Sequence, residues 1–332
     1  MRCARIRRLA TASLAVVVVM APVLASGSAM AGTIEIGVLK FGTVSWELNV
    51  IKTHDLDKKQ GVNLEVLELA GKSATSVALQ AEEVDMIVTD WVWVARQRAE
   101  GANYTFVPYS TALGALMVPA DSQVRTLAEL EGKRVGIAGG PLDKSWLLLR
   151  ALASKRHGID LDRAVDKVFA APPLLNEQIL AGRVDAVLNY WHFAARLQAA
   201  GLRRVMGVED VIKGLGVDTE VPLVGYAFKR AWANVHREDV LGFVRATREA
   251  KAILAESDAE WERLRPLMQV EDETAFRALR DSFREGIPRS WGKEERADAE
   301  RLFAILAELG GERLVGRAET LEDGTFWPHV TY

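Results

Sequence analysis

The chain repeats itself at a spacing of 100 residues, and this repeat restricts the possible folds more than any other feature of the sequence. Solenoid repeats are shorter and more numerous, whereas about 100 residues is an ordinary size for a domain. The repeat therefore predicts two related domains rather than one extended core. The matched residues are Ser45-Trp46 with Ser145-Trp146, Ala81 with Ala181, Val84-Asp85 with Val184-Asp185, Trp91 with Trp191, Ala95-Arg96 with Ala195-Arg196, Ala99 with Ala199, and Gly101 with Gly201.

Each copy alternates short apolar runs with segments of helical spacing. Strands are predicted at Thr33–Lys40, Leu64–Leu69 and Asp85–Thr89, and a helix at Leu48–Gln60. Strands that alternate with helices predict a mostly parallel, doubly wound α/β sheet. We expect lobe one at 32–113 and 221–332, lobe two at 114–220, a two-strand hinge between them, and a helical C-terminal region.

The first 31 residues have the pattern of a secretory signal peptide. Four arginines precede an apolar stretch from Leu9 to Leu24, and Ala29-Met30-Ala31 is a small-x-small cleavage site. The apolar stretch is short and contains Pro22, which disfavours a membrane anchor. We therefore expect cleavage before Gly32 and a periplasmic protein.

Charge and composition argue against several functions. The whole chain has a formal net charge of −3, and loss of the arginine-bearing leader makes it more acidic, which disfavours nucleic acid as a partner. The only cysteine, Cys3, lies in the leader. The five histidines are scattered without metal-ligand spacing, and no nucleophile motif of the GxSxG kind is present. We therefore predict no catalytic site, no metal, no cofactor and a monomer.

The repeated tryptophans follow predicted strands, where open α/β sheets bind their ligands. Trp46 and Trp146 follow the first strand of each copy, and Trp91 and Trp191 follow the third. We expect Trp46 and Trp91 to face Trp146 and Trp191 across one cleft, although core packing is an alternative for each indole. Asp90 and Asp143 lie among these rings.

Three segments resemble a known family. Leu79–Asp85, Leu127–Ile137 and Gln178–Ala186 are similar to segments of the periplasmic substrate-binding proteins of nitrate/sulfonate/taurine importers, and the resemblance covers Gly32 to Ala231. It implies a type II periplasmic-binding fold, an ABC importer permease as partner, and a small-molecule ligand held by the loops after the strands. The site residues that it implies are Phe41, Thr43, Trp46, Lys72, Ser73, Asp90, Trp91, Ser110, Ser145 and Asn189.

The chain departs from this family after its third strand, where Asp90-Trp91 replaces the usual small residues. The strand ends offer Lys72 and Lys144 but no arginine, the residue best suited to an oxyanion. Rings beside Asp90 and Asp143 suit a flat aromatic or cationic ligand, and the family resembles receptors for thiamine-precursor pyrimidines. Sulfonate, taurine or nitrate is the alternative ligand. Alternative functions are an enzyme of thiamine-pyrimidine or menaquinone synthesis on the same fold, and a module that presents ligand to a sensor.

Overall fold

The computed structural model describes residues 32–40 and 42–332. The expected signal peptide and Phe41 lie outside these residues. In the described part, no helix has both the length and the apolar character needed to cross a membrane.

The strands of the described part form two five-stranded sheets with the same arrangement. The first has the order β2-β1-β3-β10-β4 and the second the order β7-β6-β8-β5-β9. One strand in each, β10 and β5, runs antiparallel to its neighbours. The first sheet consists of β1 (Gly32–Leu39), β2 (Val62–Leu69), β3 (Met86–Asp90), β4 (Tyr104–Ser110) and β10 (Val224–Lys229). The second consists of β5 (Gly114–Val118), β6 (Arg134–Ala138), β7 (Asp166–Ala170), β8 (Ala186–Tyr190) and β9 (Arg203–Gly207).

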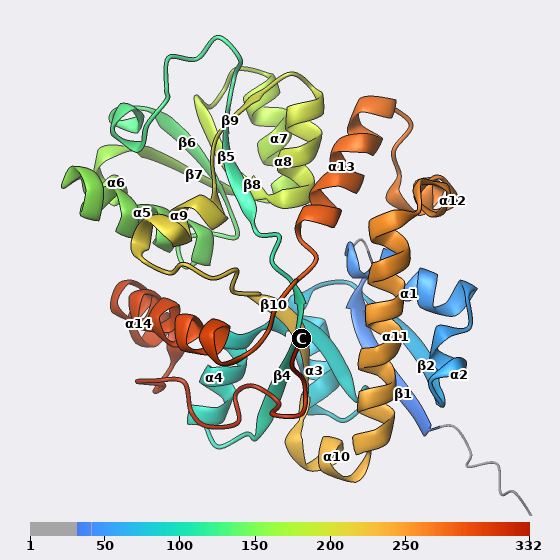
Figure 1. Ribbon diagram of the computed structural model, residues 1–332. Helices are drawn as coiled ribbons and strands as arrows, with labels where there is room; N and C mark the ends of the chain where they lie inside the picture. Colours follow the sequence, from blue (N-terminus) through green and yellow to red (C-terminus); the bar gives the residue numbers. More distant parts are fainter. Residues whose placement is uncertain (1–31, 41) are drawn as a thin grey trace, which may run out of the picture. The chain divides into compact units, whose positions relative to one another are not determined.

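This arrangement confirms the predicted fold class. We call the first sheet and its helices lobe one, and the second sheet and its helices lobe two (Figure 1). The chain passes to lobe two between β4 and β5 and returns between β9 and β10, which makes the two-strand hinge. The exact domain boundaries stay a prediction.

Helices surround both sheets. Those of lobe one are α1 (Val44–Thr53), α2 (Leu56–Lys59), α3 (Lys72–Gln80) and α4 (Trp91–Ala99). Those of lobe two are a 3₁₀ turn at Leu127–Leu130, α5 (Lys144–His157), α6 (Leu161–Ala164), α7 (Pro172–Leu180), α8 (Trp191–Ala199) and α9 (Val208–Leu215). The C-terminal region adds α10 (Arg230–Val235), α11 (Arg237–Glu256), α12 (Asp258–Met268), α13 (Glu273–Glu285) and α14 (Lys293–Val315).

The single helix predicted at Leu48–Gln60 is in fact two helices. The first ends at Thr53, and Asp55 adopts a left-handed conformation with φ 51° before the second begins. Because a non-glycine residue rarely adopts this conformation, periodicity alone does not reveal the break.

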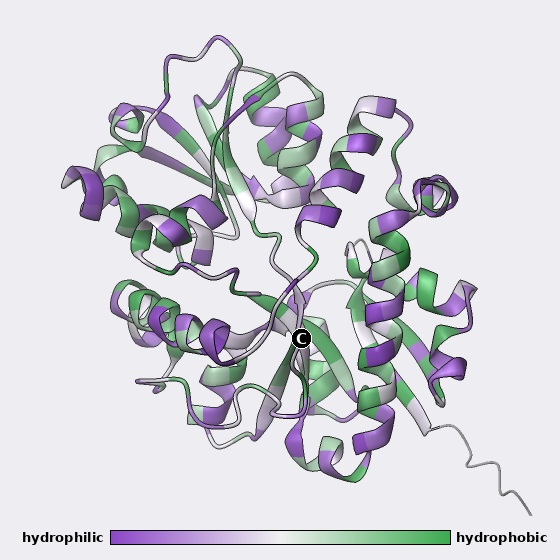
Figure 2. Ribbon diagram, in the orientation of Figure 1, coloured by the Kyte–Doolittle hydropathy of each residue, from purple (hydrophilic) through white to green (hydrophobic). Residues whose placement is uncertain are grey.

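The C-terminal helices pack on both lobes. Helix α11 lies against α1, α2 and the strands β1 and β2 of lobe one, whereas α13 packs against α8 of lobe two. Helix α14 contacts α4 and α5, one from each lobe. The hydropathy colouring in Figure 2 shows apolar residues on the strands and polar ones along much of the outer helices, as burial of one helix face requires. These helices therefore join the lobes as well as cover them.

The repeated aspartates hold equivalent joints in the two lobes. Asp85 Oδ2 accepts a hydrogen bond of 2.9 Å from the backbone N–H of Glu35, and Asp185 Oδ2 accepts one of 2.8 Å from the N–H of Arg134. Each bond ties the start of the third strand in its lobe to the first. These repeated carboxylates therefore have a structural role.

We expect Asp85→Ala and Asp185→Ala each to lower the free energy of unfolding by about 1 kcal/mol, because each loses one charge-assisted hydrogen bond. Urea denaturation measures the change. Glu83→Ala, which removes an exposed neighbouring carboxylate and leaves the bond intact, is the control. Equal stability of all three variants would contradict the prediction.

Candidate functional site

A cavity of about 240 Å³ lies where loops from both lobes meet. Its walls come from the turns that follow β1, β2, β3 and β4 in lobe one and β6 and β8 in lobe two. This is the edge at which open α/β sheets bind ligands. Seven residues expected from the sequence line it: Thr43, Lys72, Asp90, Ser110, Asp143, Ser145 and Trp191.

The two carboxylate oxygens of Asp90 make different contacts. Its Oδ1 accepts a hydrogen bond of 2.9 Å from the N–H of Trp93 and so caps α4. Its Oδ2 forms an ion pair of 3.0 Å with Nζ of Lys144, across the boundary between the lobes. Burial by itself raises the pKa of Asp90, but Lys144, Lys72 and the Trp93 N–H outweigh it and hold this pKa below its usual value. Asp90 is therefore ionised, and the positive charge of Lys144 already balances its negative charge.

Asp143 has the same capping role in lobe two but, among the described residues, no ion-pair partner at contact distance. Its Oδ1 accepts hydrogen bonds from the N–H groups of Ser145 and Trp146, at 2.9 and 3.4 Å, and its Oδ2 accepts one of 3.3 Å from the Tyr190 hydroxyl. Burial raises its pKa, and the more distant positive charges of Lys144 and Lys72 only partly oppose this. A ligand cation beside Asp143 would supply the missing charge.

Gly139 is required where the chain turns into this part of the cavity. Its φ is +79°, and a Cβ there would lie 2.5 Å from both Asp143 Oδ2 and the Tyr190 hydroxyl oxygen. Only glycine leaves room for this contact and readily adopts this φ.

An aromatic cluster borders the cavity on the side of Trp191. The Trp191 ring lies edge-on to Trp46, with centroids 6.0 Å apart, and Trp46 is only 5 % exposed. Phe283 of α13 contacts both indoles, and Trp261 of α12 packs against Phe283 at 5.1 Å. Trp191 therefore faces the cavity, whereas Trp46 supports it from behind.

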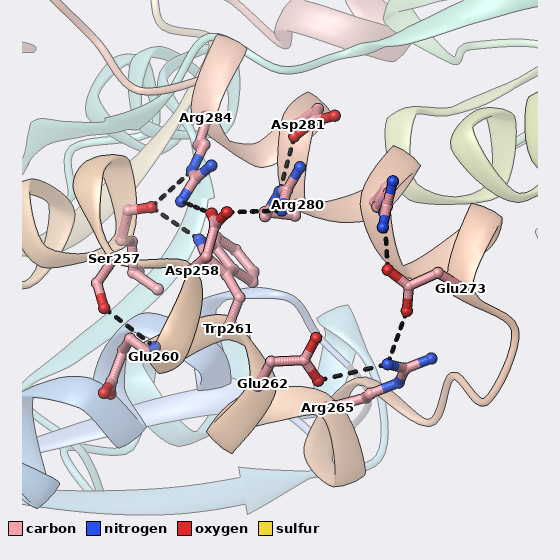
Figure 3. A network of polar contacts seen from close by, with 12 residues as sticks. Ser257, Asp258, Glu260, Trp261, Glu262, Arg265, Glu273, Arg280, Asp281 and Arg284 are labelled. Atoms are coloured by element: carbon pink, nitrogen blue, oxygen red, sulfur yellow. Dashed lines mark hydrogen bonds and ion pairs between the residues drawn. The ribbon is translucent and has the colours of Figure 1, made fainter.

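Ion pairs between α12 and α13 hold this cluster in place (Figure 3). Arg284 Nη2 lies 2.7 Å from Asp258 Oδ1, and Arg284 Nε donates to the backbone carbonyl of Leu254, which also accepts from Trp261 Nε1. These contacts join α12 to α13 beside Trp261 and Phe283.

Trp91 and Trp146 do not line the cavity, and this corrects the expected arrangement of four facing indoles. Both are 0 % exposed and belong to one buried cluster with Phe303 of α14. Trp91 Nε1 donates to the carbonyl of Pro222 at 3.0 Å. The alternative of core packing describes them, because α14 covers the turns from which they project.

Two further expected residues lie outside the cavity lining. Ser73 is exposed on α3. Asn189 is 2 % exposed, and its amide donates to Asn176 Oδ1 and to the carbonyl of Pro172 while its Oδ1 accepts from the Tyr190 N–H. It fixes the turn that presents Tyr190 and Trp191.

The lining residues absent from the expected set include Tyr109, Lys144, Tyr190 and His192. Each is adjacent in sequence to a residue that was expected, so the expected set and the cavity lining share loops but differ in individual side chains. The nitrogen of Lys72 lies 5.7 Å from the centroid of the Tyr190 ring, which adds a second cation to the same wall.

A second cavity of about 240 Å³ adjoins the first and shares Ala112, Leu113 and Trp191 with it. Its remaining lining includes the surface pair of Arg204 and Glu209. Because it contains just one of the expected site residues, we take the first cavity as the candidate site. Within the described residues, no group of three or more His, Cys, Asp or Glu side chains is placed to bind a metal ion.

His192 makes the free energy of unfolding depend on pH. Burial, and then the charge of Arg196, lower the pKa of its imidazole from 6.5 to about 4. The unfolded chain therefore takes up a proton as the pH falls from 6.5 to 4, whereas the folded chain does not, and stability is lost over that range.

We expect His192→Gln to abolish that part of the acid sensitivity, on the order of 1–2 kcal/mol for a partly exposed ring. Urea denaturation at the two ends of the pH range measures it. His157→Gln, at an exposed histidine of α5, is the control and keeps the wild-type slope. An unchanged slope in His192→Gln would refute the assignment.

Comparison with known proteins agrees with the fold. A family described as NMT1/THI5 like matches residues 52–260, well over half of the chain. A protein named "Putative thiamine biosynthesis protein" from Haemophilus influenzae is 23 % identical over 269 residues, which cover 80 % of this chain and 82 % of that protein.

Solved structures share the fold. The aliphatic sulphonate binding protein SsuA of Escherichia coli is 19 % identical, with a TM-score of 0.69 over 90 % of this chain and 95 % of its own. The alkanesulfonate-binding protein SsuA of Xanthomonas axonopodis pv. citri, bound to MOPS, is 20 % identical, with a TM-score of 0.65 over 89 % and 98 %. At such identities the likeness shows the fold alone. The resemblance expected from the sequence is confirmed.

Proposed function

We propose that this chain, which belongs to the NMT1/THI5-like family, is the periplasmic solute-binding component of an ABC importer and takes a small, amino-substituted heteroaromatic ligand. The receptor role is supported by the fold it shares with periplasmic binding proteins and by a cavity that residues of both lobes line. Ligand capture between two hinged lobes is how such receptors distinguish loaded from unloaded states.

The observation that carries the ligand class is the occupation of two helix N-termini by carboxylates. An oxyanion binds well at a helix N-terminus, where N–H groups and the helix dipole attract it. Asp90 and Asp143 already occupy these positions on α4 and α5. A sulfonate placed there would meet two carboxylates, whereas an ammonium or amino group would find an acceptor at Asp143.

The rest of the cavity suits a flat ring. Trp191, Tyr190 and Tyr109 provide aromatic surface, and Ser145 and Thr43 provide hydroxyl groups. The other helices that begin at the cavity, α1, α3 and α8, have no side-chain cap. Their N-termini therefore accommodate ligand acceptors such as ring nitrogens. An aminopyrimidine combines all three features.

The direct test is to release the molecule that co-purifies with the protein and identify it by mass spectrometry. A binding panel then compares an aminomethyl-substituted aminopyrimidine, its neutral hydroxymethyl counterpart and ethanesulfonate. We expect the aminomethyl compound to bind most tightly. Preference for ethanesulfonate would refute the ligand class and leave the receptor role in place.

Two variants locate the ligand. Asp143→Asn keeps the helix cap but removes the charge, so it should weaken the aminomethyl compound about tenfold and the hydroxymethyl compound little. Trp191→Ala should weaken both by about 1–3 kcal/mol, through lost stacking. Isothermal titration calorimetry measures both effects, with Ser73→Ala as the control outside the cavity. Equal losses for both compounds in Asp143→Asn would contradict the role of its charge.

The name of the Haemophilus influenzae relative favours an enzyme on the same fold as the second candidate. A receptor returns its bound molecule unchanged, whereas an enzyme converts it. Mass spectrometry of the panel compounds after prolonged incubation with the protein separates the two.

A further inference from the structure

Three charged side chains meet at the boundary between the lobes, and their pairing is unequal. Lys144 follows Asp143 directly in the sequence, yet its ammonium group lies 3.0 Å from Asp90 of the other lobe. Asp143 Oδ2 is left with the Tyr190 hydroxyl, at 3.3 Å. The lysine nearest to Asp143 along the chain thus neutralises a different carboxylate.

We propose that Asp90 is a specificity-determining residue: it holds Lys144 away from Asp143 and so keeps the Asp143 carboxylate available to a cationic group of the ligand. This rests on the proposed function for the nature of the ligand, but the pairing itself is a property of the chain without ligand. Asp90 acts through Lys144 and is a positioning residue in this role.

The geometry supports a competition between the two carboxylates. Lys144 lies on the first turn of α5, whose N-cap is Asp143, so one side chain stands within electrostatic range of both acids. Asp90 is fixed by its bond to the Trp93 N–H and cannot follow the lysine elsewhere without uncapping α4. Asp143 is the second carboxylate whose charge acts on Lys144, so without the Asp90 charge we expect the ammonium group to turn to Asp143.

The alternative role of Lys144, as a direct partner of an anionic ligand, predicts different behaviour. In that case removal of Lys144 abolishes binding, and Asp90 merely restrains a binding residue. If Lys144 is a cation that must be kept away, its removal does no harm and rescues the loss of Asp90.

The first experiment measures the pKa of the Asp143 carboxyl by nuclear magnetic resonance in the ligand-free protein. Asp90→Asn preserves the cap on α4, because asparagine is an equally good N-cap residue, and removes only the charge. We expect the pKa of Asp143 to fall by about one pH unit as Lys144 turns to it. In Asp90→Asn/Lys144→Met this pKa should rise to at least its wild-type position.

The matched control is Asp90→Asn/Lys72→Met. Lys72 is the other lysine of the cavity, so this variant has the same net charge as Asp90→Asn/Lys144→Met. In this control variant, the pKa of Asp143 should stay close to the lowered value expected in Asp90→Asn. If the two double variants give the same pKa, or if Asp90→Asn leaves this pKa unchanged, the proposal is wrong.

The second experiment measures binding of the aminomethyl-substituted aminopyrimidine and its neutral hydroxymethyl counterpart. Asp90→Asn should weaken the aminomethyl compound about tenfold, the equivalent of one pH unit of competition, and Lys144→Met in the same background should restore it. The ratio of the two affinities isolates the charge from any general loss of packing. If the wild-type chain binds neither compound, the proposed ligand class is wrong. The pKa measurements on Asp143 then still test whether Asp90 holds Lys144 away from Asp143.

Discussion

The capping of two helices by carboxylates that also face the cavity is the constraint on which the site depends. Asp90 and Asp143 each satisfy backbone N–H groups at the start of a helix with one oxygen and present the other to the cavity. A cap is an ordinary local device for ending the exposure of those N–H groups. Here it also reverses the electrostatic character of the positions where a helix dipole would otherwise attract an anion.

The duplication explains how these positions come together. Residues 43, 44 and 90 of lobe one correspond at a spacing of 100 to residues 143, 144 and 190 of lobe two. In the structure the third turn of one lobe meets the first turn of the other, as the contacts of Asp90 with Lys144 and of Trp46 with Trp191 show. The copies therefore pair crosswise, as expected of two similar lobes that face each other.

Much of the fold was accessible from the sequence because a strand and a helix leave periodic patterns. The two sheets and the crossing strands agree with the prediction, and the candidate cavity lies among loops named from the sequence. Individual side chains were harder to place. Trp91 and Trp191 have equivalent positions in the repeat, yet α14 buries the first while the second borders the cavity.

The C-terminal helices have no counterpart within the repeat. The repeat therefore could not predict which of the equivalent side chains these helices bury. Glu47 illustrates the same limit in the core. It stands beside Trp46, is fully buried, and is paired at 2.6 Å with Lys251 of α11, so its partner lies far along the chain outside the repeated segment. Such long-range pairs leave no periodic signal.

The crosswise pairing gives the cavity two unlike ends. At one end the third turn of lobe one meets the first turn of lobe two and brings Asp90, Asp143 and Lys144 together. At the other end the third turn of lobe two meets the first turn of lobe one, where Trp191 lies edge-on to Trp46. Two differences between the copies distinguish these ends. Asp90 corresponds to Tyr190, and Asp143 corresponds to Thr43. Both carboxylates therefore lie at the same end of a nearly symmetric cavity. The proposed ligand, with an amino-bearing end and a flat body, matches that asymmetry.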